Sequence, residues 1–210
     1  MMTRRTMAVL CGAAAMAVLT TACSHSSATP PPTSANNTST SATSSGLPHS
    51  GAPKVEHPLP ASVVSGTPCD GLTSQQLTQI LTTVPPTRPN TDAAGPSCTW
   101  INSDKNSLVS LAYDTQDHTG LSGFYENTKP QATVWKPLPD IQGFPAVAHV
   151  TPSGGSPTDF CQVSIGIADD ISVDVSIGLS DAKKGKADPC EVTAQVSDMV
   201  VTNLRQKAGS

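Results

Sequence analysis

Three side chains with acid-base chemistry stand close together in the sequence: Asp114, Asp117 and His118. They follow the run SLVSLAY at 107–113, whose composition and alternation predict a β-strand, so the three are expected at a strand end. Carboxylates beside an imidazole can transfer protons or bind a cation. Charged groups at a strand end more often form a solvated loop without a catalytic role. An envelope enzyme that uses this cluster is therefore kept as an alternative to the leading hypothesis.

Other catalytic and metal-binding patterns are absent from the sequence. There is no G-x-S-x-G motif, and Ser156, in the sequence GGSP, is expected in a turn between strands. Neither His118 nor His149 belongs to a ligand spacing typical of a metal site. We therefore expect no metal, no cofactor and no catalytic residues, that is, a protein that is not an enzyme.

Two features are candidates for a contact surface. Trp135 lies in TVWKPLP, beside prolines, and we expect its ring to be partly exposed and available for binding. Lys183, Lys184 and Lys186 form a basic run in an acidic domain. They could meet a phosphate or an acidic partner, although a solvated loop is the more common form of such a run.

The chain begins with the pattern of an exported protein. Arg4 and Arg5 precede an uncharged run at 7–20, and small residues follow up to Ala22. This is the order of regions in a secretory signal peptide, and the apolar run is too short for a membrane-spanning helix. Residues 1–22 are therefore expected to be a lipoprotein signal peptide, with the general secretory and the twin-arginine routes both open.

Cys23 directly follows this segment, in LTTAC. Lipoprotein signals end in this way: the cysteine sulfur receives a diacylglycerol, and the amino group that cleavage frees is acylated. Thr20 stands where leucine is commonest in such signals, and the alternative is a secreted protein with a spare thiol. Each buried methylene contributes about 0.8 kcal/mol, so two or three acyl chains hold a protein at a membrane durably. The lipid on Cys23 is thus the expected membrane anchor.

A polar segment, residues 24–66, separates Cys23 from the expected domain. Residues 24–50 contain no charged residue and no aromatic one, so we expect a disordered tether that cannot bury enough surface to order itself.

The mature chain is expected to be acidic. Without Arg4 and Arg5 the chain keeps ten of its twelve Lys and Arg, against sixteen Asp and Glu, for a net charge of about −6. That charge disfavours nucleic acid as a partner.

Four cysteines lie in the remaining chain: Cys69, Cys98, Cys161 and Cys190. In an exported protein an even set of four predicts two disulfides, with three possible pairings. We favour the pairing of neighbours, Cys69 with Cys98 and Cys161 with Cys190. Each bridge would then close a loop of about 30 residues and stabilise the domain by about 3.5 kcal/mol. Trp100 is expected to pack over the first bridge in the core.

Residues 67–210 are expected to form one α+β domain on an antiparallel sheet of about five strands. Apolar periodicity and capping residues predict elements in the order α-β-β-α-β-β-β-α. The expected helices are 74–81, 121–128 and one that begins after Asp188; the expected strands are 98–100, 107–113, 144–150, 160–167 and 171–177. In ISVDVSI at 171–177 the Ile and Val residues should face the core, and Ser172, Asp174 and Ser176 should face water.

Four short motifs together resemble a known family: PCDGLT at 68–73, CTW at 98–100, CQVSI at 161–165 and DPCE at 188–191. With the signal and the tether, they are similar to actinobacterial exported lipoproteins of unknown function, of the mycobacterial Lpr type. The resemblance implies the two neighbouring disulfides and attachment to the outer face of the plasma membrane, and it implies no activity. The order of elements is also similar to PsbP/Mog1-like sandwiches, an analogy of fold alone.

The leading functional hypothesis is a membrane-anchored, non-enzymatic binding or assembly module of the cell envelope. Its partner would be an unknown protein, lipid or glycan. Besides the envelope enzyme, a second alternative is a carrier of a hydrophobic ligand, which requires a cavity lined by Val, Ile and Leu.

Overall fold

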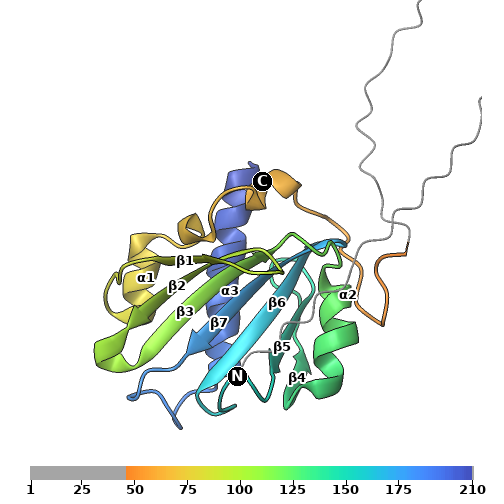
Figure 1. The fold of residues 1–210 in the computed structure, drawn as a ribbon. Coiled ribbons are helices and arrows are strands. Elements are labelled where there is room, and N and C mark those ends of the chain that lie inside the picture. The colour runs from red at the N-terminus through yellow and green to blue at the C-terminus, as the bar shows by residue number, and fades with distance from the viewer. Residues whose placement is uncertain (1–45, 210) are drawn as a thin grey trace, which may run out of the picture. The chain divides into compact units, whose positions relative to one another are not determined.

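The computed structural model describes residues 46–209, which form a seven-stranded antiparallel sheet in the order β1-β2-β3-β7-β6-β5-β4 (Figure 1). Neighbouring strands pair through antiparallel hydrogen bonds across the whole sheet. The strands are β1 (Arg88–Thr91), β2 (Pro96–Asn102), β3 (Ser107–Asp114), β4 (Val134–Pro137), β5 (Ala146–Val150), β6 (Phe160–Ala168) and β7 (Ile171–Gly178). The predicted α+β class and antiparallel sheet are confirmed.

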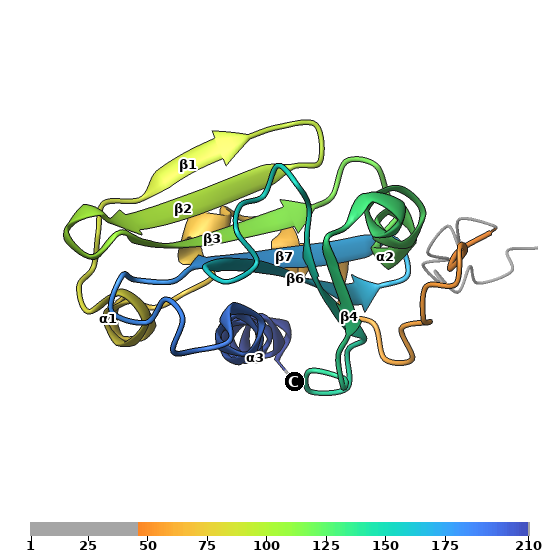
Figure 2. The same ribbon diagram turned by 90° about the horizontal axis from the view of Figure 1, so that it is seen from below.

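Three α-helices and several short helical turns accompany the sheet. The α-helices are α1 (Ser74–Leu81), α2 (Leu121–Gly123) and α3 (Pro189–Ala208); the short turns are η1 (Ala61–Val64), η2 (Pro68–Asp70), η3 (Ser103–Lys105), η4 (Phe124–Thr128) and η5 (Lys129–Gln131). Helices α1 and α3 lie together on one side of the sheet (Figure 2). None of the helices in residues 46–209 combines the length and the hydrophobicity that a membrane-spanning helix requires.

Both long helices begin at capping residues. The Thr73 side chain accepts from the backbone N–H of Gln76, and the Gln76 side chain accepts in return from the Thr73 N–H, which is a capping box. Asp188 Oδ1 accepts from the backbone N–H of Cys190 at 2.8 Å and so caps α3, whose first residue is Pro189. These caps fix where each helix starts and bear out the starts predicted from the sequence.

The core lies between the sheet and α1 and α3. Alternate residues of the central strands, such as Leu111, Val173 and Ile165, are fully buried there. Val196, Val200 and Leu204 of α3 recur every three or four residues, which places them on one helix face, and all three are buried in the core. The prediction that the Ile and Val residues of β7 face the core is therefore confirmed.

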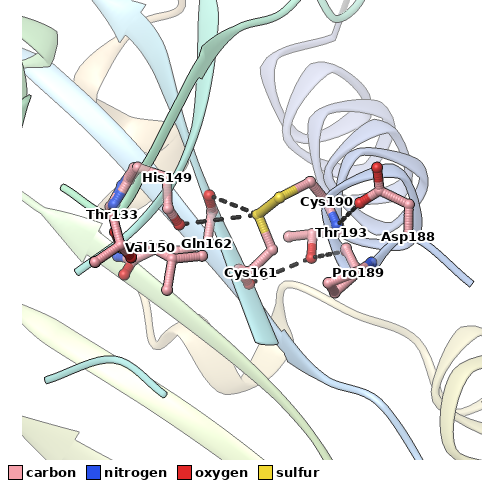
Figure 3. The surroundings of a disulfide bond; sticks show 9 residues. All are labelled: Thr133, His149, Val150, Cys161, Gln162, Asp188, Pro189, Cys190 and Thr193. Carbon is pink, nitrogen blue, oxygen red and sulfur yellow. Dashed lines mark hydrogen bonds between the residues drawn. A yellow bond between two sulfur atoms is a disulfide. The ribbon is translucent and has the colours of Figure 1, made fainter. Parts of the chain in front are cut away.

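Two disulfides join the sheet to the elements that cover it, with the predicted pairing Cys69–Cys98 and Cys161–Cys190. The second connects β6 to the first turn of α3, as Figure 3 shows. Beside it, Thr193 Oγ1 donates to the carbonyl oxygen of Pro189 at 2.7 Å. Trp100 is fully buried in the core on the same strand as Cys98, as predicted.

The sheet has two strands more than expected, β1 and β4, and both are at its edges. Their sequences, RPNT and VWKP, each contain a proline and lack apolar alternation. Proline cannot donate a ladder hydrogen bond, so strands that contain it are confined to edges and give a weak sequence signal. The segment Leu121–Thr128 is helical as predicted, but its second part, η4, is a single turn of π-helix.

The folded domain begins before residue 67, the predicted boundary. Val55, Leu59, Val63 and Val64 are buried in the core. The Leu59 N–H also donates to the carbonyl oxygen of Ile167 at 2.9 Å. Four aliphatic residues in a polar stretch are enough to bind this segment to the domain. The predicted signal peptide, Cys23 and the first part of the tether lie outside the described residues.

Candidate functional site

The face of the sheet opposite α1 and α3 is polar. Because successive side chains of a strand point to opposite faces, β3, β7 and β6 present their intervening residues on this side. These are Ser110, Ala112 and Asp114; Ser172, Asp174 and Ser176; Gln162, Ser164 and Gly166. Such a row of small and acidic residues leaves room over the sheet and supplies hydrogen-bonding groups.

Ser172 and Asp174 were expected to face water, and this prediction is wrong. Ser172 is fully buried and Asp174 is only 6% exposed. The chain after β3 covers this end of the polar face: a Cβ built at Gly166 would lie 3.1 Å from Leu121 of α2. Alternation identifies which residues share a face, but it cannot tell that a second layer covers that face.

Asp114 and Asp174 form a carboxyl pair on adjacent strands. In the register of β3 and β7, Asp114 is opposite Ser172 and Asp174 is opposite Ala112, so the two acids are diagonal neighbours on one face. Their carboxyl groups are close enough for each to shift the pKa of the other. Ser172 Oγ donates to Asp114 Oδ2 at 3.0 Å, which fixes the orientation of that carboxyl group.

The two carboxyl groups differ from exposed ones in their affinity for protons. Burial raises the pKa of Asp174 well above its ordinary value, and the neighbouring Asp114 raises it further. Burial also raises the pKa of Asp114, and hydrogen bonds from Asp174 and Ser172 offset part of that increase. Two neighbouring carboxylates resist ionising together, so the pair keeps a proton to a higher pH than an exposed aspartate does.

A pocket of about 360 Å³ opens above this pair. Its floor comes from the sheet: Ala112, Asp114, Gln162 and Asp174. One wall is the segment from Asp117 to Thr128, and the other is the loop between β1 and β2, with Asp92 and Ala94. The volume is in the range of small-molecule sites in proteins.

The wall formed by α2 and η4 packs closely on the sheet. Gly120 has φ +51°, and a Cβ there would collide with the backbone oxygen of Asp169. The π-helical turn that follows brings Phe124, Asn127 and Thr128 to the pocket. π-Helical turns are rare and are found frequently at functional sites.

An aromatic cluster lies on the same helical segment, against β4 and β5. The Tyr125 and Trp135 rings meet edge to face with centroids 5.0 Å apart, and Lys129 Nζ lies 5.1 Å from the Tyr125 ring centroid. His149 packs against Phe124 and bonds through Nε2 to Ser164 Oγ at 2.8 Å. Burial lowers the pKa of His149 to about 4, so this imidazole is neutral at ordinary pH and serves as a structural contact.

The predicted cluster of Asp114, Asp117 and His118 is not assembled as one site. Asp114 and Asp117 both line the pocket over the polar face. His118 is exposed, has φ +52° and lines a different hollow, beside Val64 and Ile171. The structure therefore brings Asp114 and Asp117 to one pocket and His118 to another.

The predicted contact residues are divided between two places. Trp135 is half-buried in the aromatic cluster, so its ring is partly exposed as expected. Lys183 and Lys186 are exposed in the loop before α3, and Lys184 Nζ binds Asp181 Oδ1 at 2.8 Å. Ser156 is exposed in a turn and bonds to Thr158 Oγ1 at 2.8 Å.

An apolar cleft lies between α1 and α3 on the other face. Ile80, Val196 and Met199 contribute to its lining, and Lys183 stands at its edge. Its volume is about 110 Å³. For comparison, a cavity that binds one benzene molecule measures about 150 Å³, so the cleft is small for a lipid chain.

Asp174 is the site residue that sequence reasoning missed. The signal was present, since Asp174 is the one acidic residue inside an aliphatic strand, where a charged group is unfavourable unless it has a role. The alternating pattern instead predicts Asp174 as a water-facing residue. The sequence analysis groups its partner Asp114 with Asp117 and His118, whereas the structure pairs it with Asp174.

Comparison with family models places the chain in a family of proteins of unknown function, DUF3558, whose model matches residues 18–203. The chain therefore belongs to that family. Neither curated proteins nor solved structures gave a match. The likeness to PsbP/Mog1-like folds, suggested by the order of elements, stays a prediction.

Proposed function

We propose that this protein is a lipid-anchored module of the cell envelope that binds a ligand on the polar face of its sheet. The observation that carries the proposal is the open pocket whose floor is the buried pair of Asp114 and Asp174. Burying two carboxyl groups together costs stability. A domain that retains such a pair beneath an open pocket is organised for binding there.

The anchor in this proposal is Cys23, with the protein held at the outer face of the plasma membrane as an Lpr-type lipoprotein. Its support is the signal-like segment 1–22 and the LTTAC sequence that ends it. Membrane fractionation of a Cys23→Ala variant tests the anchor. The variant should leave the membrane fraction, and equal retention of variant and parent would contradict lipidation at Cys23.

The binding site is tested by closing the pocket at its rim. Asn127 lines the pocket and is exposed, whereas Gln131, in the following helical turn η5, is exposed but not among the lining residues. Asn127→Trp should block the pocket, and Gln131→Trp is the matched control. Full-length proteins purified from membranes are unfolded and the released small molecules are identified by mass spectrometry. A compound should accompany the parent and the control and be lost from Asn127→Trp; the same compounds from all three would refute the site.

An envelope enzyme is the second candidate, and one observation favours it. Asp114 and Asp174 are neighbouring carboxyl groups with raised pKa at the floor of a pocket, an arrangement that can place an acid and a base side by side. In this alternative these two residues replace the predicted group with Asp117 and His118. Turnover of an envelope extract by the parent, lost in both Asp114→Asn and Asp174→Asn while ligand release persists, would favour catalysis over binding. No comparable observation favours the hydrophobic carrier.

A further inference from the structure

The pocket over the polar face has an acidic lining without a counter-charge. Four carboxyl groups border it: Asp92, Asp114, Asp117 and Asp174. No lysine or arginine is among the described residues that line this pocket. Uncompensated charge of one sign in a concave site concentrates ligands of the opposite sign.

Asp174 adds an observation independent of the charge count. It is 6% exposed, it lines the pocket, and its Oδ1 atom accepts no hydrogen bond from an amide or hydroxyl donor of residues 46–209. A buried acceptor without a partner costs stability. A donor supplied by a ligand in the pocket would satisfy this oxygen, and a donor that also carries positive charge would satisfy it best.

The geometry favours an organic cation over a metal ion. Within the described part of the chain no group of three or more Asp, Glu, His or Cys side chains is arranged to hold a metal. Asp92 is also committed to its own loop, where its Oδ1 accepts from the backbone N–H of Ala94 at 2.9 Å. An amine instead needs only two or three acceptors and an apolar contact for its carbon chain, which Phe124 and Ala112 provide.

We propose that the ligand of this pocket is a small organic cation, an amine or guanidinium group whose N–H donors bind Asp114 and Asp174. This inference rests on the proposed function, because it names the ligand class of the same site. The cationic group can belong to a free amine or to a lysine or arginine side chain of a polypeptide. Bound to both carboxyl groups, it favours their full ionisation, and the proton that the pair retained is released to solvent.

The test is calorimetric titration of the full-length protein in detergent with three probes of matched length. Cadaverine carries two positive charges, 1,5-pentanediol is neutral and glutarate is negative. Cadaverine should bind at least tenfold more tightly than either of the others, and Asp174→Asn should weaken it at least tenfold. Repeating the titration in buffers of different ionisation enthalpy should show protons released on cadaverine binding, an effect that a purely structural role of Asp174 would not produce.

Each remaining outcome decides a separate question. A peptide with blocked termini and one free lysine side chain that binds more tightly than cadaverine would support the cation and assign it to a polypeptide. Equal binding of 1,5-pentanediol and cadaverine, or no binding of cadaverine, would overturn the cationic ligand. If a neutral or acidic compound is nevertheless released from the parent and lost in Asn127→Trp, the binding function stands and only the ligand class is wrong.

Discussion

The two disulfides allow a quantitative test of what stabilises the domain. Each bridge joins residues 29 positions apart. In the chain-entropy model a loop of that length contributes about 3.5 kcal/mol at 25 °C, because the cross-link restricts the unfolded chain. A domain of this size is stable by about 5–15 kcal/mol in total, so either bridge supplies a substantial part. The paired variants Cys69→Ala/Cys98→Ala and Cys161→Ala/Cys190→Ala each remove one.

Because the loop lengths are equal, each paired variant is the control for the other. Both should lose about 3.5 kcal/mol of unfolding free energy in guanidinium titrations, with the remaining bridge kept oxidised. Cys98 and Cys161 are fully buried on β2 and β6, so the small Ala side chain adds no clash in either variant. A loss below about 1 kcal/mol in both variants would refute the entropic account. Losses that differ by more than about 2 kcal/mol would show that native packing around one bridge dominates.

Two further substitutions test the polar face and its wall. Burial raises the pKa of Asp174, so the native state binds its proton more tightly than the unfolded state does, and this group costs the parent stability as pH rises above about 4. Asp174→Asn should therefore become more stable than the parent between pH 4 and pH 7, by about 1–3 kcal/mol. A stability difference that does not grow with pH in unfolding titrations would contradict the burial argument. Gly120→Ala should lower the melting temperature because its Cβ meets the backbone oxygen of Asp169. Gly185→Ala is the control: Gly185 has φ +69° and open space around it, so this substitution adds only backbone strain. Equal decreases of the melting temperature in both variants would show that close packing of α2 on the sheet contributes nothing.

The parts of the fold with local signals could be predicted from the sequence. Helix α1 has its capping box at Thr73, and β7 has its alternating ISVDVSI run. Both signals depend on residues close together in the chain. The edge strands were missed because their pairing comes from neighbours in the sheet rather than from their own residues: β1 consists of RPNT, all exposed.

Long-range contacts explain what could not be predicted of the site. Asp114 and Asp174 are 60 positions apart in the sequence, and only the register of β3 with β7 makes them neighbours. The burial of Asp174 depends on α2 and η4, which no pattern within β7 reveals. Val55 shows the same limit, since its N–H binds Asp169 Oδ1 at 2.8 Å across most of the domain's sequence.

The central claim is that the pocket over Asp114 and Asp174 is occupied in the cell. Its most direct test is photocrosslinking in intact cells, with benzoylphenylalanine introduced at Asn127 in one full-length protein and at Gln131 in another. The intact mass of each protein is then measured after irradiation. The account predicts a defined mass increase for the Asn127 position and none for Gln131, because Asn127 lines the pocket and Gln131 does not. No adduct at Asn127, or the same adducts at both positions, would contradict it.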